Sequence, residues 1–207
     1  MKIVVVDLDD TLISTSDLKQ ELFDIISAVG VPREEVDNLY QSSKDGNGIP
    51  IIDNLVKKVA ENYQGVDREA LRGSLDTMYS CIGEERLLLD RLAVLEERYP
   101  RSEYKYVLVT KGEADIQERK ISAFRLRAVF DEVKVVNGPK VEFLRELAGE
   151  IEGLVFVDDK ESEREAVLAE LKSEGLVVID PLELDETRES DQAGEEKIEE
   201  GPSFREG

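Results

Sequence analysis

The 207-residue sequence contains no histidine and only one cysteine, Cys81. Without histidine, neither a Ser-His-Asp triad nor a Cys-His pair can form, and imidazole cannot bind zinc or iron. A single cysteine excludes an intramolecular disulfide. The sequence also lacks an apolar run long enough to span a membrane and an N-terminal segment typical of a signal peptide. We therefore expect a cytoplasmic protein whose chemistry depends on carboxylates, lysines, hydroxyls and hard cations.

Positive charge is also scarce, because 27 Lys and Arg residues stand against 48 Asp and Glu residues. The resulting net charge of −21 argues against a nucleic acid or an anionic membrane as a partner. It does not exclude a small anion, because a local site can be positive on an acidic protein. The sequence is 41% hydrophobic, which is enough for a packed core, and it does not indicate an oligomeric state.

Short runs of apolar, mostly β-branched residues occur five times and are bounded by turn residues. Continuous apolar runs of this length are typical of parallel strands that are buried on both faces. In the second half of the chain, amphipathic helical patterns lie between them. This alternation predicts an α/β fold with a Rossmann-like, doubly wound parallel sheet. The predicted strands lie at the start of the chain and at 104–110, 128–136, 153–159 and 175–180, and the predicted helices at 113–125, 141–151 and 163–172.

The segment 15–101 breaks this alternation, because it contains helical patterns and no convincing strand. It is interpreted as an all-helical insertion between the first two strands, with helices at 16–29, 51–62, 67–79 and 84–98. The remainder, 1–14 and 102–182, forms the predicted α/β core. Residues 183–207 are acidic and poor in large apolar side chains, so we expect a disordered tail.

Three carboxylates, Asp7, Asp9 and Asp10, are crowded into four residues directly after the first predicted strand. Like charges at this spacing repel, and a carboxylate beside a buried strand loses solvation. A divalent cation would offset both costs. Because ligands of parallel α/β sheets collect at the carboxyl ends of the strands, we expect Asp158 to share Mg²⁺ with Asp7. Asp10 is predicted to be a turn or capping residue.

The other strand ends supply groups that suit an anion. The second strand of the sheet ends in Thr110-Lys111-Gly112, and Lys140 follows the third strand at the start of a helix. Thr110, the backbone amides of Lys111 and Gly112, and Lys140 are expected to hold phosphate oxygens, assisted by the helix N-terminus. The combination of acids, lysines and a metal suits phosphoryl transfer.

Asp7 and Asp9 are spaced for a reaction that uses two carboxylates. Residues i and i+2 of a strand point to the same side. If the backbone bends after Leu8, one carboxylate can attack phosphorus while the other protonates the leaving oxygen. A carboxylate is a plausible nucleophile for phosphorus once a metal and a lysine offset the anionic repulsion.

The order Asp7-x-Asp9-x-Thr11, Thr110, Lys140 and Asp158-Asp159 resembles the motifs of the haloacid dehalogenase (HAD) superfamily. The resemblance covers the α/β core, about half of the chain. It implies that Asp7 is the nucleophile that forms an aspartyl-phosphate and that Asp9 is the general acid and then the base. It also implies that Asp9 gives a backbone carbonyl to Mg²⁺, so that the metal site consists of Asp7, Asp9 and Asp158.

The resemblance has two further implications. With an aspartate at position 9, the motif resembles that of the phosphatase and phosphomutase branch, because the dehalogenases and phosphonatases of the family lack this aspartate. A helical insertion between the first two motifs is a C1 cap in family terms, a lid that favours small phosphorylated metabolites. The predicted function is therefore that of a Mg²⁺-dependent phosphatase acting on a small phosphomonoester.

Two alternatives stand beside this function. A phosphomutase would use the same core but protect the aspartyl-phosphate from water until a second substrate hydroxyl arrives. A non-catalytic phosphate-binding or signalling protein would gather similar side chains without turnover. The sequence does not name the substrate, nor does it show whether the loop 42–50 faces the site. Asp159 and Glu163 are interpreted either as residues that orient metal-bound waters or as helix N-terminal acids.

Overall fold

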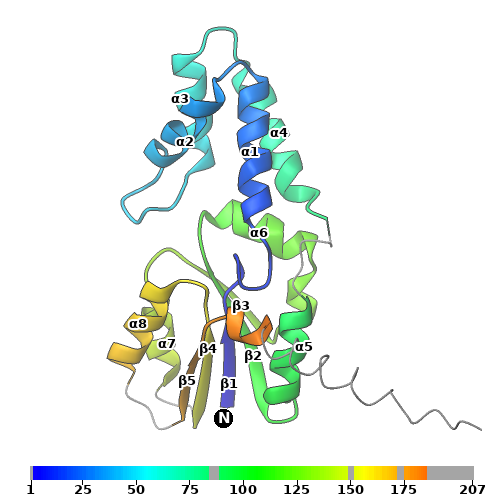
Figure 1. Cartoon of the computed structure of the whole chain (residues 1–207), viewed down its shortest axis with the longest axis vertical. Coiled ribbons are helices and arrows are strands. Elements are labelled where there is room, and N and C mark those ends of the chain that lie inside the picture. Colours follow the sequence, from blue (N-terminus) through cyan, green and yellow to red (C-terminus); the bar gives the residue numbers. More distant parts are fainter. Residues whose placement is uncertain (1, 84–88, 149–151, 172–174, 186–207) are drawn as a thin grey trace, which may run out of the picture.

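The computed structural model describes residues 2–83, 89–148, 152–171 and 175–185. Its centre is a five-stranded parallel sheet with the strand order β3-β2-β1-β4-β5 (Figure 1). The middle strand, β1, pairs with β2 on one side and β4 on the other, so the carboxyl ends of these three strands are neighbours. The strands are β1 (Lys2–Val6), β2 (Tyr104–Lys111), β3 (Glu132–Val136), β4 (Gly153–Val157) and β5 (Leu176–Ile179).

Helices lie on both sides of the sheet, which confirms the predicted α/β, Rossmann-like fold. In Figure 1, α7 and α8 lie on one side and α5 on the other. The bounds of these helices, with α6 and a short 3-10 helix η2, are α5 (Leu89–Arg98), α6 (Ala114–Ala123), η2 (Leu126–Ala128), α7 (Lys140–Ala148) and α8 (Glu161–Glu170).

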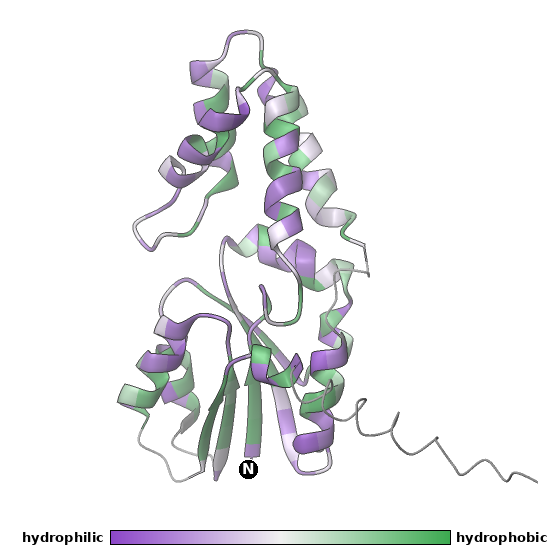
Figure 2. Ribbon diagram, viewed as in Figure 1, coloured by the Kyte–Doolittle hydropathy of each residue, from purple (hydrophilic) through white to green (hydrophobic). Residues whose placement is uncertain are grey.

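The alternation of side chains along β1 builds two cores. Ile3 and Val5 pack on the face covered by α7 and α8, whereas Val4 and Val6 pack on the opposite face with α5 and α6. Figure 2 shows the central strands as the most continuously hydrophobic part of the molecule. Each fully buried side chain of this size stabilises the fold by about 1.5–3 kcal/mol. The sheet is therefore a rigid platform for the polar residues at its carboxyl edge.

Between β1 and β2, the described residues form helices and no strand of the sheet. The first four of these helices, α1 (Ser16–Ala28), α2 (Arg33–Ser42), α3 (Ile52–Asn62) and α4 (Arg68–Ser80), stand beyond the carboxyl edge of the sheet (Figure 1). α1 packs against α2 and α4, and α4 also contacts α6. The sequence predicted three of the four and missed α2. The apolar face of α2 is short and consists of Val36, Leu39 and Tyr40, of which only Val36 is fully buried.

The fifth helix of this segment, α5, lies beside the sheet rather than with α1–α4 (Figure 1). Its residues Leu92 and Leu95 belong to the same apolar cluster as Tyr106 of β2. The predicted boundary at residue 101 stays a prediction, and 84–88 of the predicted helix lie outside the described residues. The predicted disordered tail, 183–207, falls mostly on residues 186–207, which lie outside the described residues. Of its described residues, Leu184 is buried in the core.

The third strand begins later than the sequence predicted. Residues 126–128 form the 3-10 helix η2, and β3 starts only at Glu132. Arg125, directly before η2, has a positive φ of 52° and reverses the chain after α6. The apolar residues Val129 and Phe130 fill the core from this connection, which explains why their hydrophobicity resembled that of a strand.

Candidate active site

The carboxyl ends of the three central strands carry the predicted site residues. Asp7 directly follows β1, Asp158 directly follows β4, and Thr110 is the penultimate residue of β2. The backbone N–H of Asp7 donates to the carbonyl of Val157 at 2.9 Å, which holds two strand ends side by side. The sheet topology thus brings together residues that are far apart in the sequence, as the motif order predicted.

Asp7, Lys140 and Asp158 form a buried charged cluster at these strand ends, with exposed fractions of 1%, 0% and 0%. Lys140 Nζ donates to Asp158 Oδ2 at 2.6 Å and forms an ion pair with Asp7 Oδ1. The backbone N–H of Lys140, the first residue of α7, donates to Glu163 Oε2 at 3.0 Å. One buried ammonium group faces two buried carboxyl groups, so ionisation of both carboxyl groups would require a further cation.

Burial strongly affects the protonation of this cluster. Burial raises the pKa of Asp7 to about 8, against the charge of Lys140 and with the help of Asp158. For Lys140, burial acts to lower the pKa, but attraction to the Asp7 and Asp158 carboxylates outweighs it and raises the pKa. Lys140 is therefore a permanent cation at neutral pH, and a cation bound beside Asp7 would favour its ionised form.

A third carboxylate completes a set that fits a hard divalent cation. Carboxylate oxygens of Asp7, Asp158 and Asp159 lie within 4.8 Å of one another. Asp7 Oδ2 and Asp159 Oδ1 are buried without a hydrogen-bond donor in the part of the chain that the structure describes. Burial raises the pKa of Asp159, with Lys160 opposing. Unsatisfied carboxylate oxygens in this arrangement are the ligands that Mg²⁺ prefers.

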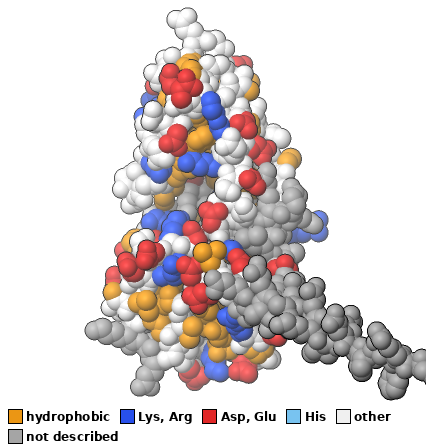
Figure 3. All heavy atoms as spheres, viewed as in Figure 1, with side chains coloured by type: hydrophobic (Ala, Val, Ile, Leu, Met, Phe, Trp, Pro, Cys, Tyr) orange, Lys and Arg blue, Asp and Glu red, His pale blue; other side chains and the backbone are white. Residues whose placement is uncertain are grey.

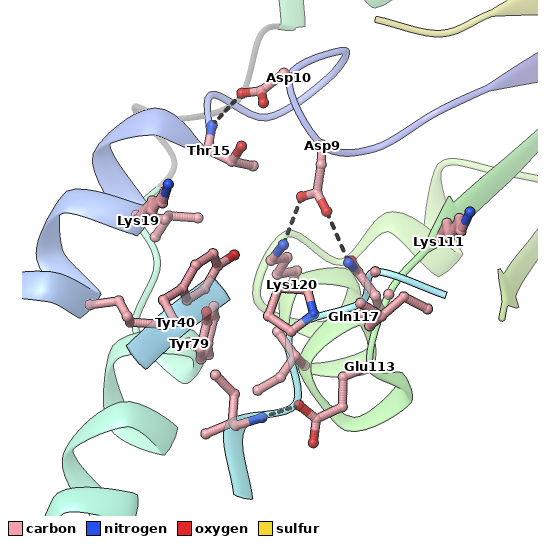
Figure 4. Close-up of a pocket in the computed structure, with 18 of the residues that line it drawn as sticks. Asp9, Asp10, Thr15, Lys19, Tyr40, Tyr79, Lys111, Glu113, Gln117 and Lys120 are labelled. Atoms are coloured by element: carbon pink, nitrogen blue, oxygen red, sulfur yellow. Dashed lines mark hydrogen bonds and ion pairs between the residues drawn. The ribbon is translucent and has the colours of Figure 1, made fainter. Parts of the chain in front are cut away.

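The side chain of Asp9 does not join these three carboxylates. Asp9 Oδ1 accepts a hydrogen bond from Lys120 Nζ at 2.7 Å, and Asp9 Oδ2 accepts one from Gln117 Nε2 at 2.9 Å. Figure 4 shows Asp9 pointing toward these two residues of α6. Burial acts to raise the pKa of Asp9, but the charge and hydrogen bond of Lys120 outweigh it, so this pKa is lowered. The predicted metal contact through the Asp9 backbone carbonyl stays a prediction.

The predicted phosphate-binding residues lie at the end of β2. Thr110 Oγ1 is buried and lacks a hydrogen-bond partner among the described residues, so it is available to a ligand. Lys111 Nζ lies 3.5 Å from Glu163 Oε1. A Cβ atom at Gly112 would collide with the Gln117 side chain, so glycine leaves room for the group that contacts Asp9. That these three residues and Lys140 bind phosphate remains a prediction.

A cavity of about 450 Å³ lies on the Asp9 side of the site. Asp9, Lys111, Gly112, Gln117 and Lys120 line it from the sheet and α6, and Asp7 and Asp158 do not. Figure 3 shows charged side chains of both signs where the helical half of the molecule meets the sheet half. The volume falls in the range that is typical of small-molecule sites.

The helices α1–α4 and the loop after α2 supply the other wall of this cavity. Tyr40 of α2 and Tyr79 of α4 lie next to Lys120 in Figure 4, and Lys19 of α1 lies above Tyr40 in this view. Residues 47–50 also line the cavity, so the loop whose orientation the sequence left open faces the site. A single hydrogen bond from the Ile52 N–H to Glu113 Oε2 (2.7 Å) links the start of α3 to the start of α6.

Asp10 lies in the turn after Asp9 and caps a backbone N–H there, as the sequence predicted. Asp10 has a positive φ of 58°, a conformation that Asp tolerates better than most residues. Its Oδ1 accepts a hydrogen bond from the N–H of Thr15 at 2.9 Å. Thr11 Oγ1 accepts one from the N–H of Asp159 at 3.2 Å, which connects this turn to the end of β4.

Sequence reasoning missed Gln117 and Lys120. Both lie on the helix that follows Thr110-Lys111-Gly112, and a spacing of three residues places them on one helical face. They are buried polar residues among apolar neighbours. The available signal was a glutamine and a lysine at the inward positions of an amphipathic helix that directly follows the predicted phosphate-binding residues.

Comparison with known proteins defines the class of fold. No protein-family model and no curated protein sequence matches this chain. Among solved structures, a haloacid dehalogenase-like hydrolase from Burkholderia xenovorans is similar with a TM-score of 0.68 at 18% identity, covering 85% of this chain and 81% of that chain. A protein assigned as a β-phosphoglucomutase from Thermotoga maritima gives 0.54 at 17% identity, covering 92% and 99%.

The L-2-haloacid dehalogenase from Xanthobacter autotrophicus is also similar, with a TM-score of 0.52 at 16% identity over 86% of this chain and 76% of that chain. The chain therefore has the fold of the haloacid dehalogenase-like hydrolases. These similar structures carry the names of enzymes with different reactions, so the shared fold does not define the reaction of this chain. Within the residues described here, no helix is long and apolar enough to cross a membrane.

Proposed function

We propose that this protein is a Mg²⁺-dependent phosphatase that hydrolyses a small phosphomonoester through an aspartyl-phosphate on Asp7. The observation that carries the proposal is the buried cluster of Asp7, Lys140 and Asp158. Among the described residues, neither Asp7 Oδ2 nor Thr110 Oγ1 at the end of β2 has a hydrogen-bond partner. Buried polar atoms left unsatisfied in this way cost free energy, so they indicate a ligand. A metal and a phosphoryl group would satisfy both kinds of oxygen.

Each residue would have a defined role. Asp7 Oδ2 attacks phosphorus while Lys140 holds Oδ1, and the bond from phosphorus to the leaving oxygen breaks. Asp9 gives a proton to that oxygen. Asp9 then accepts a proton from water, which attacks phosphorus and releases phosphate from Asp7. Thr110 and the backbone amides of Lys111 and Gly112 bind the phosphoryl oxygens and stabilise their developing charge.

Asp7, Asp158 and Asp159 would hold Mg²⁺, which supplies neutralising charge for the phosphoryl oxygens when it is bound. Lys120 and Gln117 hold Asp9 on the cavity side, next to the space for the leaving group. Asp9 must be protonated to act as an acid, and Lys120 opposes this. The pair therefore has to loosen when substrate enters.

The proposed substrate is a small phosphorylated metabolite in the cytoplasm. The cavity is bounded by α1, α2 and α4, which restricts access for large partners and favours closure over a small molecule. The net charge of −21 disfavours nucleic acid and anionic membranes. These helices would then act as the cap of the enzyme.

The experiment measures the rate at which the protein releases phosphate from an aryl phosphate, once in the presence of Mg²⁺ and once in the presence of a chelator. We expect activity in Mg²⁺ only, and losses of about 10²–10⁴-fold in Asp9→Asn, whose acid–base function is removed. Asp7→Asn should lose all activity, because an amide is a far poorer nucleophile. Asp10→Asn is the matched control, because asparagine keeps the oxygen that caps Thr15. Undiminished activity in Asp7→Asn would refute the mechanism.

Isomerisation of a sugar phosphate without net release of phosphate would instead favour the phosphomutase. A folded protein that binds Mg²⁺ and phosphate but turns over no substrate would favour the non-catalytic alternative. The same purified protein serves for both tests. A product assay detects the phosphomutase, and a binding titration detects the non-catalytic alternative.

A further inference from the structure

A buried arginine on α5 contacts the segment that follows Asp9. Arg91 is 8% exposed. Its Nη1 donates to the carbonyl oxygens of Asp10 at 2.8 Å and Thr11 at 3.0 Å. Its Nε and Nη2 donate to Asp185 Oδ1 at 2.8 Å and Oδ2 at 2.6 Å. One guanidinium therefore joins three segments that are remote in the sequence.

The two carbonyls belong to a tight and strained turn. Asp10 has a left-handed backbone, which costs a non-glycine residue about 1 kcal/mol or more. The N–H groups of Leu12 and Ile13 both donate to the carbonyl of Leu8, so the backbone on either side of Asp9 is fixed. The carbonyls of Asp10 and Thr11 both accept from Arg91, and the contact with Thr11 is buried, where an unpaired carbonyl would be costly.

The geometry requires arginine and benefits from Asp185. A guanidinium presents donors in two directions in one plane, which a lysine ammonium cannot do. The bidentate contact with Asp185 fixes that plane. The hydrogen bond from Arg91 also lowers the pKa of Asp185, so the carboxylate stays ionised at neutral pH. The contact reaches both sides of the site, because Thr11 also binds the N–H of Asp159.

We propose that Arg91, oriented by Asp185, is a positioning residue that fixes the turn at 10–11 and thereby the direction of the Asp9 side chain. This inference rests on the proposed function, in which Asp9 transfers protons. It assigns Asp185, at the end of the described residues, an indirect role in the active site through its contact with Arg91. The contacts of Arg91 with the turn and with Asp185 are called the clamp below. Neither Arg91 nor Asp185 lines the cavity, whereas Asp9 does, so we expect the clamp to act on catalysis more than on substrate affinity.

The test compares Asp185→Ala and Arg91→Lys with the wild type. Because small misplacement of a catalytic group lowers turnover strongly, we expect kcat to fall about 10-fold or more in both variants, with KM changed less than about twofold. Asp185→Glu should recover part of the loss. Glu96→Ala is the matched control, because Glu96 also lies on α5, pairs with Arg101 at 2.7 Å and is 38% exposed, against 49% for Asp185.

A second readout is independent of activity. Hydrogen–deuterium exchange of a peptide covering 8–15 should be faster in Asp185→Ala than in the wild type or Glu96→Ala, because the turn loses its anchor. If Arg91→Lys fails to fold, Asp185→Ala alone tests the inference, because the Asp185 side chain lies at the surface and its removal is expected to leave the fold intact.

Unchanged kcat in a folded Asp185→Ala would overturn the inference, even if its melting temperature falls, because the contact would then be merely structural. If the wild type has no phosphatase activity, the proposed function fails, and only the exchange measurement tests whether Arg91 and Asp185 fix the turn. Faster exchange confined to 8–15 would then support the clamp, and unchanged exchange would overturn it.

Discussion

The two halves of the candidate site are built differently. Asp7, Lys140 and Asp158 are fully buried, and they come from strand ends and the start of α7. Asp9 is 20% exposed, is bound by two side chains of α6, and faces a cavity walled by α1–α4. One half is a fixed charge cluster suited to a nucleophile and a metal. The other half is a partly exposed contact beside the cavity, where the proposed function requires proton transfer to the leaving group. Under the proposed function, the buried half would be the reaction centre and the half beside the cavity would contact the variable part of the substrate.

The largest expected difference between the halves is in stability. Lys140→Met leaves two buried carboxylates without their cation, so we expect the free energy of unfolding to fall by about 3–5 kcal/mol. Lys120→Met removes one partner of the partly exposed Asp9, for which we expect about 1–3 kcal/mol. Urea denaturation of both variants with a chelator measures the difference. Equal losses would contradict the contrast in burial.

The pH dependence of stability should have opposite signs in the two halves. In metal-free protein, Asp7 holds its proton up to about pH 8, whereas the unfolded chain ionises near pH 4. The folded state thus binds one more proton in this window, and Asp7 makes stability fall with rising pH by up to about 1.4 kcal/mol per unit. Asp9 has a lowered pKa, so its contribution is present above about pH 4 and lost as pH falls further.

These signs can be measured by urea denaturation from pH 3 to 8 with a chelator. Asp7→Asn should flatten the decline above pH 4, and Asp9→Asn should reduce the loss below it. Lys140 stays charged throughout, because its pKa is raised. Mg²⁺ should also flatten the upper decline, since it competes with the Asp7 proton. An identical slope in wild type and Asp7→Asn would show that the pKa of Asp7 is not raised in the folded protein.

The smallest effect concerns the packing behind Asp9. Gly112→Ala places a methyl group against the Gln117 side chain, which must move away from Asp9. We expect kcat to fall several-fold through displacement of the acid, with folding retained. Gly73→Ala is the control: its Cβ meets open space in α4, so the protein should gain roughly 0.5–1 kcal/mol of stability and keep its activity. Equal kcat in both variants would contradict a role for Gln117.

The sequence predicts the positions of the residues in the buried half of the site better than the contacts of Asp9 in the other half. The sheet, its helices on both faces and the strand-end positions of Asp7, Thr110 and Asp158 follow from apolar runs and from the rule that parallel strand ends converge. The direction of the Asp9 side chain does not, because its partner Lys120 lies 111 residues away. Arg91 is hidden for the same reason, since its contact with Asp185 spans 94 residues. Only tertiary packing decides such long-range polar contacts.

The most direct test of the central claim is acid-quench trapping of the phosphorylated protein in Asp9→Asn with an aryl phosphate. An aryl leaving group needs little protonation, so the Asp7 half should react although the Asp9 half is disabled, and the intermediate should then accumulate. The account predicts a burst of about one aryl alcohol per protein and a phosphoryl group on the peptide that contains Asp7. No burst, or a phosphoryl group on another residue, would contradict it.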